Sequence, residues 1–169
     1  DGSFVLNSND PSANFVSISD SQTTDSFTGE NVSGIKLKAP GGSSVVTPAT
    51  TLLVEIKKSS PTISNSEVAN ALGLSGVDIT SFNPFAAGVD QNLALVSEKV
   101  ANQIISTVST ISAAAEGTGA NKDLAFDKAV GAVSSAVINE INDGDSSDSL
   151  SFSDTSVLNQ IKSSAKSQL

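Results

Sequence analysis

The sequence contains few groups that could act as catalysts, because it has no His, Cys, Met, Trp, Tyr or Arg. Without His or Cys, the Ser–His and Cys–His arrangements that activate a nucleophile cannot form. Ser163 and Lys166 match an S-x-x-K spacing, but the S-D-N and K-T-G elements that accompany it in acyl-transferring enzymes are absent. In a Ser-rich chain this spacing arises by chance. We interpret the two residues as a solvated helical turn and expect a protein that is not an enzyme.

Other catalytic patterns are equally incomplete. Paired carboxylates can hydrolyse glycosidic bonds, but the chain has no Trp or Tyr to stack on a sugar ring. Gly41 and Gly42 are not followed by the Gly-Lys-Ser/Thr ending of a phosphate-binding loop. The sequence therefore nominates no catalytic residue.

Calcium is the one cofactor that the residue pattern suggests. Asp143, Asp145 and Asp148 alternate with small residues in a short acidic loop, and hard cations prefer oxygen ligands from such loops. The loop lacks the central Gly and terminal Glu of an EF-hand, so a solvated loop after a helix remains the open alternative. A second acidic cluster comprises Asp20, Asp25 and Glu30.

The charge of the chain restricts its partners. The formal net charge is −9, and all nine basic residues are Lys. A nucleic-acid-binding protein needs a basic surface for phosphates, and binding to an anionic membrane surface needs one too. No apolar run approaches the length of a membrane span. We therefore expect neither nucleic-acid binding nor membrane insertion, and a soluble acidic surface that can meet divalent cations.

The spacing of apolar residues, which predicts the secondary structure around any site, changes at Ala39–Leu53. Residues 1–47 carry short alternating apolar runs, whereas apolar residues after Pro48 recur at helical spacing. The spacing predicts helices over about 48–58, 64–73, 90–115, 121–141 and 153–169. The expected fold is α+β: a small N-terminal antiparallel β-layer over 1–47, followed over 48–169 by an antiparallel bundle of about five helices.

Two helix starts are specified by local sequence. Thr47 is a suitable N-cap before Pro48, whose missing N–H costs nothing at the first helical position. Ser64 and Glu67 have the spacing of a capping box. Between the second and third helices, Phe82 and Phe85 flank Asn83-Pro84, and we expect both rings in the core.

Three stretches match a known signature. They are Thr24-Asp25-Ser26-Phe27-Thr28-Gly29; Ala39-Pro40 with Val45-Val46-Thr47-Pro48 and Thr50-Thr51-Leu52; and Leu72-Gly73-Leu74 with Asp78-Ile79-Thr80, Phe82 and Pro84. Together they resemble a module of large secreted and cell-surface, adhesin-like proteins of bacteria. Ala49 stands where that signature usually has Leu, and Asn83 where it has Asp. The resemblance implies an extracellular structural or adhesive setting rather than a reaction.

The resemblance also has a structural implication at the N-terminus. Asp1 to Leu6 is similar to the tail of a hairpin that closes the small β-domain of such modules, and the preceding strand is absent here. The sheet would then have an unpaired edge strand, which can form backbone hydrogen bonds with a strand of another chain. A frayed terminus is the open alternative. The predicted assembly edge comprises Phe4, Val5, Leu6, Phe15, Val16 and Ile18.

Two functions of different classes follow. The first is a non-enzymatic structural or adhesive subunit at the bacterial cell surface, which assembles into fibres by strand addition at this edge. Its partners would be copies of itself or neighbouring domains of a surface protein. The alternative is a monomeric recognition module that binds glycan or calcium within a larger surface protein. The state of assembly separates them.

Overall fold

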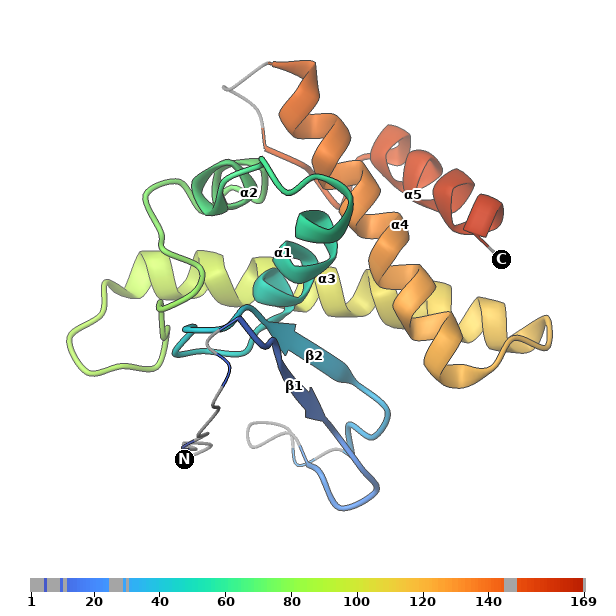
Figure 1. Cartoon of the computed structure of the whole chain (residues 1–169), viewed down its shortest axis with the longest axis horizontal. Coiled ribbons are helices and arrows are strands. Elements are labelled where there is room, and N and C mark those ends of the chain that lie inside the picture. The colour runs from blue at the N-terminus through green and yellow to red at the C-terminus, as the bar shows by residue number, and fades with distance from the viewer. Residues whose placement is uncertain are drawn as a thin grey trace.

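The computed structural model describes residues 5, 10, 12–24, 29, 31–144 and 149–168. Two antiparallel strands, β1 (Phe15–Ile18) and β2 (Lys36–Ala39), precede α1 (Pro48–Ser59), α2 (Asn65–Ala71), α3 (Gln91–Gly117), α4 (Lys122–Asp143) and α5 (Thr155–Gln168). The strands lie side by side below α1, and the helices pack as a bundle (Figure 1). The expected α+β class is confirmed.

The caps predicted from local sequence are present. Thr47 Oγ1 accepts a hydrogen bond from the Thr50 backbone N–H (3.1 Å), and Thr50 Oγ1 accepts one from the Thr47 N–H (2.8 Å). In α2, Ser64 Oγ accepts from the Glu67 N–H (3.1 Å), and Glu67 Oε2 accepts from the Ser64 N–H (2.7 Å). Both pairs satisfy N–H groups that a helix start leaves without partners.

The helix at the centre of the bundle is α4. It contacts α1, α2, α3 and α5, and it lies between α1 and α5 in Figure 1. Its buried face is rich in small side chains, which let neighbouring helices approach closely. The buried residues of α4 are Ala125, Phe126, Ala129, Val130, Ala132, Val133, Ser134, Ala136 and Val137.

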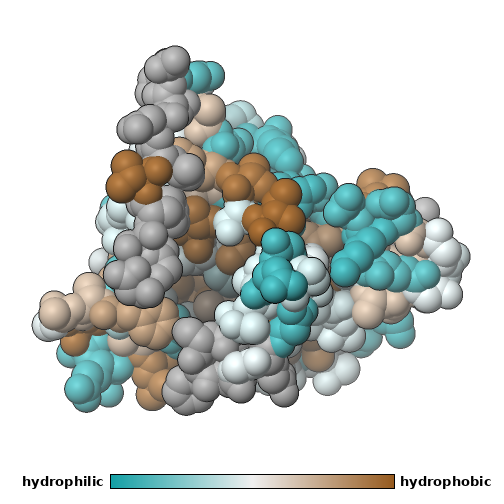
Figure 2. Space-filling model, turned by 90° about the horizontal axis from the view of Figure 1, so that it is seen from below, coloured by the Kyte–Doolittle hydropathy of each residue, from teal (hydrophilic) through white to brown (hydrophobic). Residues whose placement is uncertain are grey.

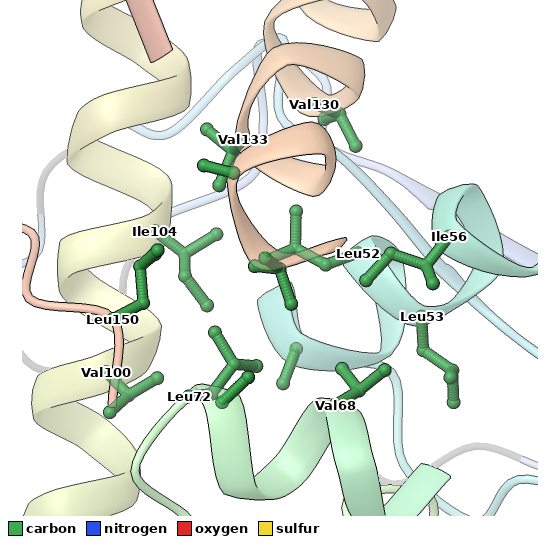
Figure 3. Packing of buried hydrophobic residues seen from close by; sticks show 14 of the residues in the cluster. Leu52, Leu53, Ile56, Val68, Leu72, Val100, Ile104, Val130, Val133 and Leu150 are labelled. Carbon is green, nitrogen blue, oxygen red and sulfur yellow. The ribbon is translucent and has the colours of Figure 1, made fainter. Parts of the chain in front are cut away.

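The core joins α4 to the other helices through branched aliphatic side chains. Leu52 and Ile56 of α1 are fully buried, and they pack with Val68 of α2, Ile104 of α3 and Val133 of α4 (Figure 3). Burying each such side chain stabilises the fold by about 1.5–3 kcal/mol before conformational entropy is subtracted. The helices therefore form a stably packed core, and β2 contacts α1 of this core.

One of the two phenylalanine rings expected in the core is exposed. Phe82 is partly buried against the core, but Phe85 is 80% exposed. The Phe85 N–H donates to Asn83 Oδ1 (3.0 Å), so the ring follows a tight local turn on the surface instead of entering the core. In the described part of the chain, no helix combines the length and apolar character needed to cross a membrane.

Candidate assembly edge

The two strands form a hairpin with one face toward the helices. Their register pairs Phe15 with Ala39, Val16 with Lys38, Ser17 with Leu37 and Ile18 with Lys36. Because paired residues share a face, Val16 and Ile18 lie on the same face as the two lysines. On the other face, Leu37 lines a small cavity with Leu52 and Phe126. The hairpin therefore has a core-facing side and an outer side.

The outer side of β1 is apolar and exposed. Val16 is 51% exposed and Ile18 is 69% exposed, whereas Phe15 on the opposite face is half-buried. Apolar residues lie among hydrophilic ones on the face seen from below (Figure 2). Val16 and Ile18 are both β-branched and lie on the same face of the strand, and β-branched residues favour strand pairing.

The backbone of β2 turns its outer edge toward α1. The Lys38 N–H donates to Thr51 Oγ1 (2.9 Å), and the Lys38 C=O accepts from Thr50 Oγ1 (2.8 Å). These groups point away from β1, so Val16 and Lys38 form a non-hydrogen-bonded pair. Two hydroxyl groups of α1 thus take the place of a third strand beside β2.

The same alternation turns backbone groups of β1 outward, away from β2. Since Val16 faces Lys38 without exchanging bonds, its N–H and C=O project from the far edge of β1. Ile18 does the same, because the next residue, Ser19, is bonded to Ile35 through its N–H (2.9 Å). Among the hydrogen bonds of the described residues, none satisfies these groups of Val16 and Ile18. Within the described part of the chain, the edge therefore presents two donors and two acceptors.

Two ion pairs anchor β2 to α4. Lys38 Nζ lies 2.8 Å from Asp127 Oδ1, and Lys36 Nζ lies 3.2 Å from Asp127 Oδ2. Partial burial raises the pKa of Asp127, but the hydrogen bonds and charges of Lys38 and Lys36 outweigh it and hold the pKa below its ordinary value. Asp127 therefore stays ionised, and the side chains of Lys36 and Lys38 reach from the outer side of β2 to α4.

Ser19 fastens the loop end of the hairpin. Its hydroxyl donates to the Val32 C=O (2.6 Å) and accepts from the Ile35 N–H (2.8 Å). Next to it, the Gln22 N–H donates to Asp20 Oδ1 and, with the Thr23 hydroxyl, lowers the pKa of Asp20. Asp20 thus stabilises a turn. Its two predicted companions in the acidic cluster, Asp25 and Glu30, lie outside the described residues.

The predicted edge residues are partly brought together. Phe15, Val16 and Ile18 all lie in β1, but Phe15 occupies the opposite face. Val5 is 87% exposed, and Phe4 and Leu6 lie outside the described residues.

The predicted calcium loop begins where α4 ends. Asp143 is the last residue of α4 and is exposed. It is followed by Gly144 in the left-handed conformation (φ 72°), a usual way to end a helix. Asp145 and Asp148 lie outside the described residues. No group of three or more acidic residues that could hold a metal occurs among the residues that are described. Calcium binding stays a prediction.

A surface groove of about 510 Å³ lies beside the residues that join the strands to α1. Its walls come from the segment Val45–Ala49, from Pro84 and Phe85, and from Glu98 and Ala101 of α3. Most of these side chains are apolar. The part of the chain with the most specific sequence signature therefore lines a concave surface as well as connecting two elements.

Sequence reasoning missed the contacts that close the β2 edge. Alternation places Lys36 and Lys38 on one face, which is a signal that an acidic residue would lie opposite them. It does not identify Asp127, which is 89 and 91 residues away in sequence. From the sequence, Thr50 and Thr51 were interpreted only as part of a helix start. In the structure, their hydroxyls form hydrogen bonds with the backbone of β2.

Comparisons with known proteins add no assignment: no family model matches this chain, and no curated protein or solved structure shows significant similarity to it.

Proposed function

We propose that this protein is a non-enzymatic structural or adhesive subunit, extracellular or at the bacterial cell surface, that assembles by adding a β-strand at the free edge of β1. The observation that carries the proposal is the contrast between the edges of the sheet. The β2 edge is bonded to α1, whereas the backbone groups at the β1 edge have no partner among the described residues and lie beside the exposed side chains of Val16 and Ile18.

The strand itself lacks the residues that proteins usually place on exposed edges. Natural edge strands carry Lys, Pro or an inward charge, or are covered by a helix or loop. The strand Phe15-Val16-Ser17-Ile18 has no charge and no Pro. An added strand gains main-chain hydrogen bonds along the whole edge, while pockets for alternate side chains give specificity.

Composition and the resemblance to adhesin-like modules support a non-enzymatic role outside the cell or at its surface. The chain carries a net charge of −9 and lacks the side chains of the common nucleophile–base pairs. A high net charge keeps single chains soluble, and directional backbone pairing then supplies association.

The test compares three forms of the full chain by light scattering over a range of concentrations. The wild-type chain is expected to form species larger than a monomer. The double variant V16K/I18K is expected to remain monomeric, because edge lysines oppose strand pairing. The matched control, L95K/L124K, replaces two apolar residues that are also exposed, 69% and 51%, on α3 and α4, and it should assemble like the wild type.

Two results would contradict strand addition at β1. One is a wild-type chain that stays strictly monomeric and compact at the highest concentration reached. The other is a V16K/I18K variant that assembles as readily as the control. Far-ultraviolet circular dichroism of each variant establishes that the fold is retained.

The groove favours a second candidate, recognition of a ligand by a monomer. A concave surface of this size is in the range of small-ligand sites, and Phe85, one of its lining residues, offers an exposed aromatic ring. A glycan array probed with the wild type and with F85A would test the glycan form: binding lost in F85A supports it, and no bound glycan removes it. For calcium, a thermal melt that does not shift at millimolar Ca²⁺ would remove a site in the folded state.

A further inference from the structure

We propose that Asn31 is a modification site, at which a sugar is attached to the side-chain amide nitrogen Nδ2. Asn31-Val32-Ser33 is the only Asn-x-Ser/Thr sequence in the chain, and this pattern is typical of N-glycosylation acceptors on the surface of secreted proteins. A pattern of three residues also arises by chance, so the conformation and exposure of these residues decide whether it can act as an acceptor. This modification goes beyond strand addition at β1 and does not depend on it.

The two side chains that define the acceptor pattern are on the surface. Asn31 and Ser33 are exposed, whereas Val32 between them is partly buried. Asn31 pairs with Thr24 in an isolated antiparallel bridge beyond the loop end of the hairpin, and the Val32 N–H donates to the Thr23 C=O (3.1 Å). Alternate residues of an extended segment point to the same side. The amide of Asn31 and the hydroxyl of Ser33 are therefore both accessible to a transferase.

The side-chain amide of Asn31 is held in an Asx turn. Its Oδ1 accepts a hydrogen bond from the Ser33 backbone N–H (3.1 Å), which is the bond to the backbone two residues on that defines this turn. A hydrogen bond to the amide oxygen draws electron density from Nδ2 toward Oδ1, so an Nδ2 proton is easier to remove. The turn also brings Ser33, with its hydroxyl, next to the amide that would react.

Ser19 fixes the backbone around this turn. Its hydroxyl donates to the Val32 C=O (2.6 Å) and accepts from the Ile35 N–H (2.8 Å), and its C=O accepts from the Gly34 N–H (2.9 Å). Gly34 has φ 87°, a left-handed conformation that glycine adopts without steric cost. The chain therefore turns directly after Ser33 and presents the acceptor residues on a short, supported loop.

The other contact of the Asn31 amide is compatible with an attached sugar. Nδ2 donates to the Ser21 C=O (2.8 Å), and this bond uses one of the two N–H groups of the amide. In the transfer, Nδ2 attacks the anomeric carbon of a sugar that carries phosphate or pyrophosphate at that carbon. The N–C bond forms, the C–O bond to the phosphate breaks with its electron pair leaving on the phosphate, and one Nδ2 proton passes to a base of the transferase. The product keeps one N–H, as the contact with Ser21 requires.

Mass spectrometry of the chain purified from the cells that produce it tests the proposal. The peptide that contains Asn31 is expected to carry the added mass of a sugar, and fragmentation is expected to place that mass on Asn31. A single added sugar indicates a nucleotide-activated donor, whereas a longer oligosaccharide indicates a lipid-linked donor, and both results support the proposal. An unmodified Asn31 in all molecules, or sugar found only on Ser and Thr hydroxyls, overturns it.

Two variants at Ser33, produced in the same cells, separate the acceptor pattern from the structural role of the turn. S33A removes the hydroxyl but keeps the backbone N–H that is bonded to Asn31 Oδ1, so the turn should remain and the sugar should be lost. S33T keeps a hydroxyl and should keep the sugar. Circular dichroism establishes that both variants are folded. Sugar that persists on Asn31 in S33A would show attachment without recognition of the pattern and would overturn the proposal.

Discussion

The two edges of the small sheet are treated in opposite ways. At β2, the backbone of Lys38 is bonded to Thr50 and Thr51, and the side chains of Lys36 and Lys38 are paired with Asp127. At β1, Val16 and Ile18 are exposed and have outward backbone groups without partners among the described residues. In the part of the chain that the structure describes, the helical body closes one edge and does not close the other.

The difference shows how a two-stranded sheet can be held firmly and still accept a partner. An isolated hairpin is marginal in water, so docking β2 on α1 and α4 supplies the stability that β1 lacks. β1 is then presented at the far side of a supported strand. Changes at the β2 edge should therefore affect folding, and changes at the β1 edge should affect assembly.

The largest effect is expected from T51V. Valine keeps the volume of this buried side chain but removes the hydroxyl that accepts from the Lys38 N–H. A buried donor left without a partner costs about 1–3 kcal/mol. Urea unfolding followed by circular dichroism measures the loss, since the chain has no Trp or Tyr. S17A, at the exposed centre of β1, is the matched change at the other edge.

A somewhat smaller loss is expected from G34A. Gly34 has φ 87°, and an added Cβ would lie 2.5 Å from Lys122 Nζ. The left-handed backbone costs an ordinary residue about 1–2 kcal/mol, and the Lys122 side chain must also move. G42A shares the positive φ (82°) without a neighbour within 4 Å. Equal losses in urea unfolding for the two variants would show that the Lys122 contact contributes nothing.

D127N should cost about 1 kcal/mol at neutral pH, because the carboxylate is more than a third exposed and solvent screens its ion pairs. Since the folded pKa of Asp127 is lowered, its contribution is complete above the unfolded pKa and is lost as the pH falls through the folded pKa. The stability difference between wild type and D127N should therefore shrink below about pH 4. A difference that is constant from pH 7 to pH 3 would contradict this.

The smallest effect on folding is expected from S17A and V16K/I18K. Their side chains are exposed, so unfolding free energies should change by less than about 0.5 kcal/mol. Chemical denaturation at a concentration where wild type is monomeric checks this without interference from assembly. A loss as large as that of T51V would mean that the β1 edge supports the fold, and the contrast between the edges would disappear.

Features that depend on near neighbours in sequence could be predicted. The caps at Thr47 and Ser64 join residues three positions apart, and the alternation in β1 and β2 follows from the two-residue period of a strand. Phe85 shows the limit of such reasoning. Its apolar character predicts burial, but the turn at Asn83 keeps it on the surface.

Sequence patterns were enough to predict the α+β class, the helix starts and the alternating residues of β1, because these depend on backbone preferences and contacts within a few residues. Packing in the folded chain makes α4 the central helix, pairs Asp127 with Lys36 and Lys38, and closes β2 with hydroxyls of α1. Those contacts join residues that are 12 to 91 positions apart. Their partners are selected by packing, so the closure of the β2 edge could not be predicted from the sequence, although the exposed residues of β1 could.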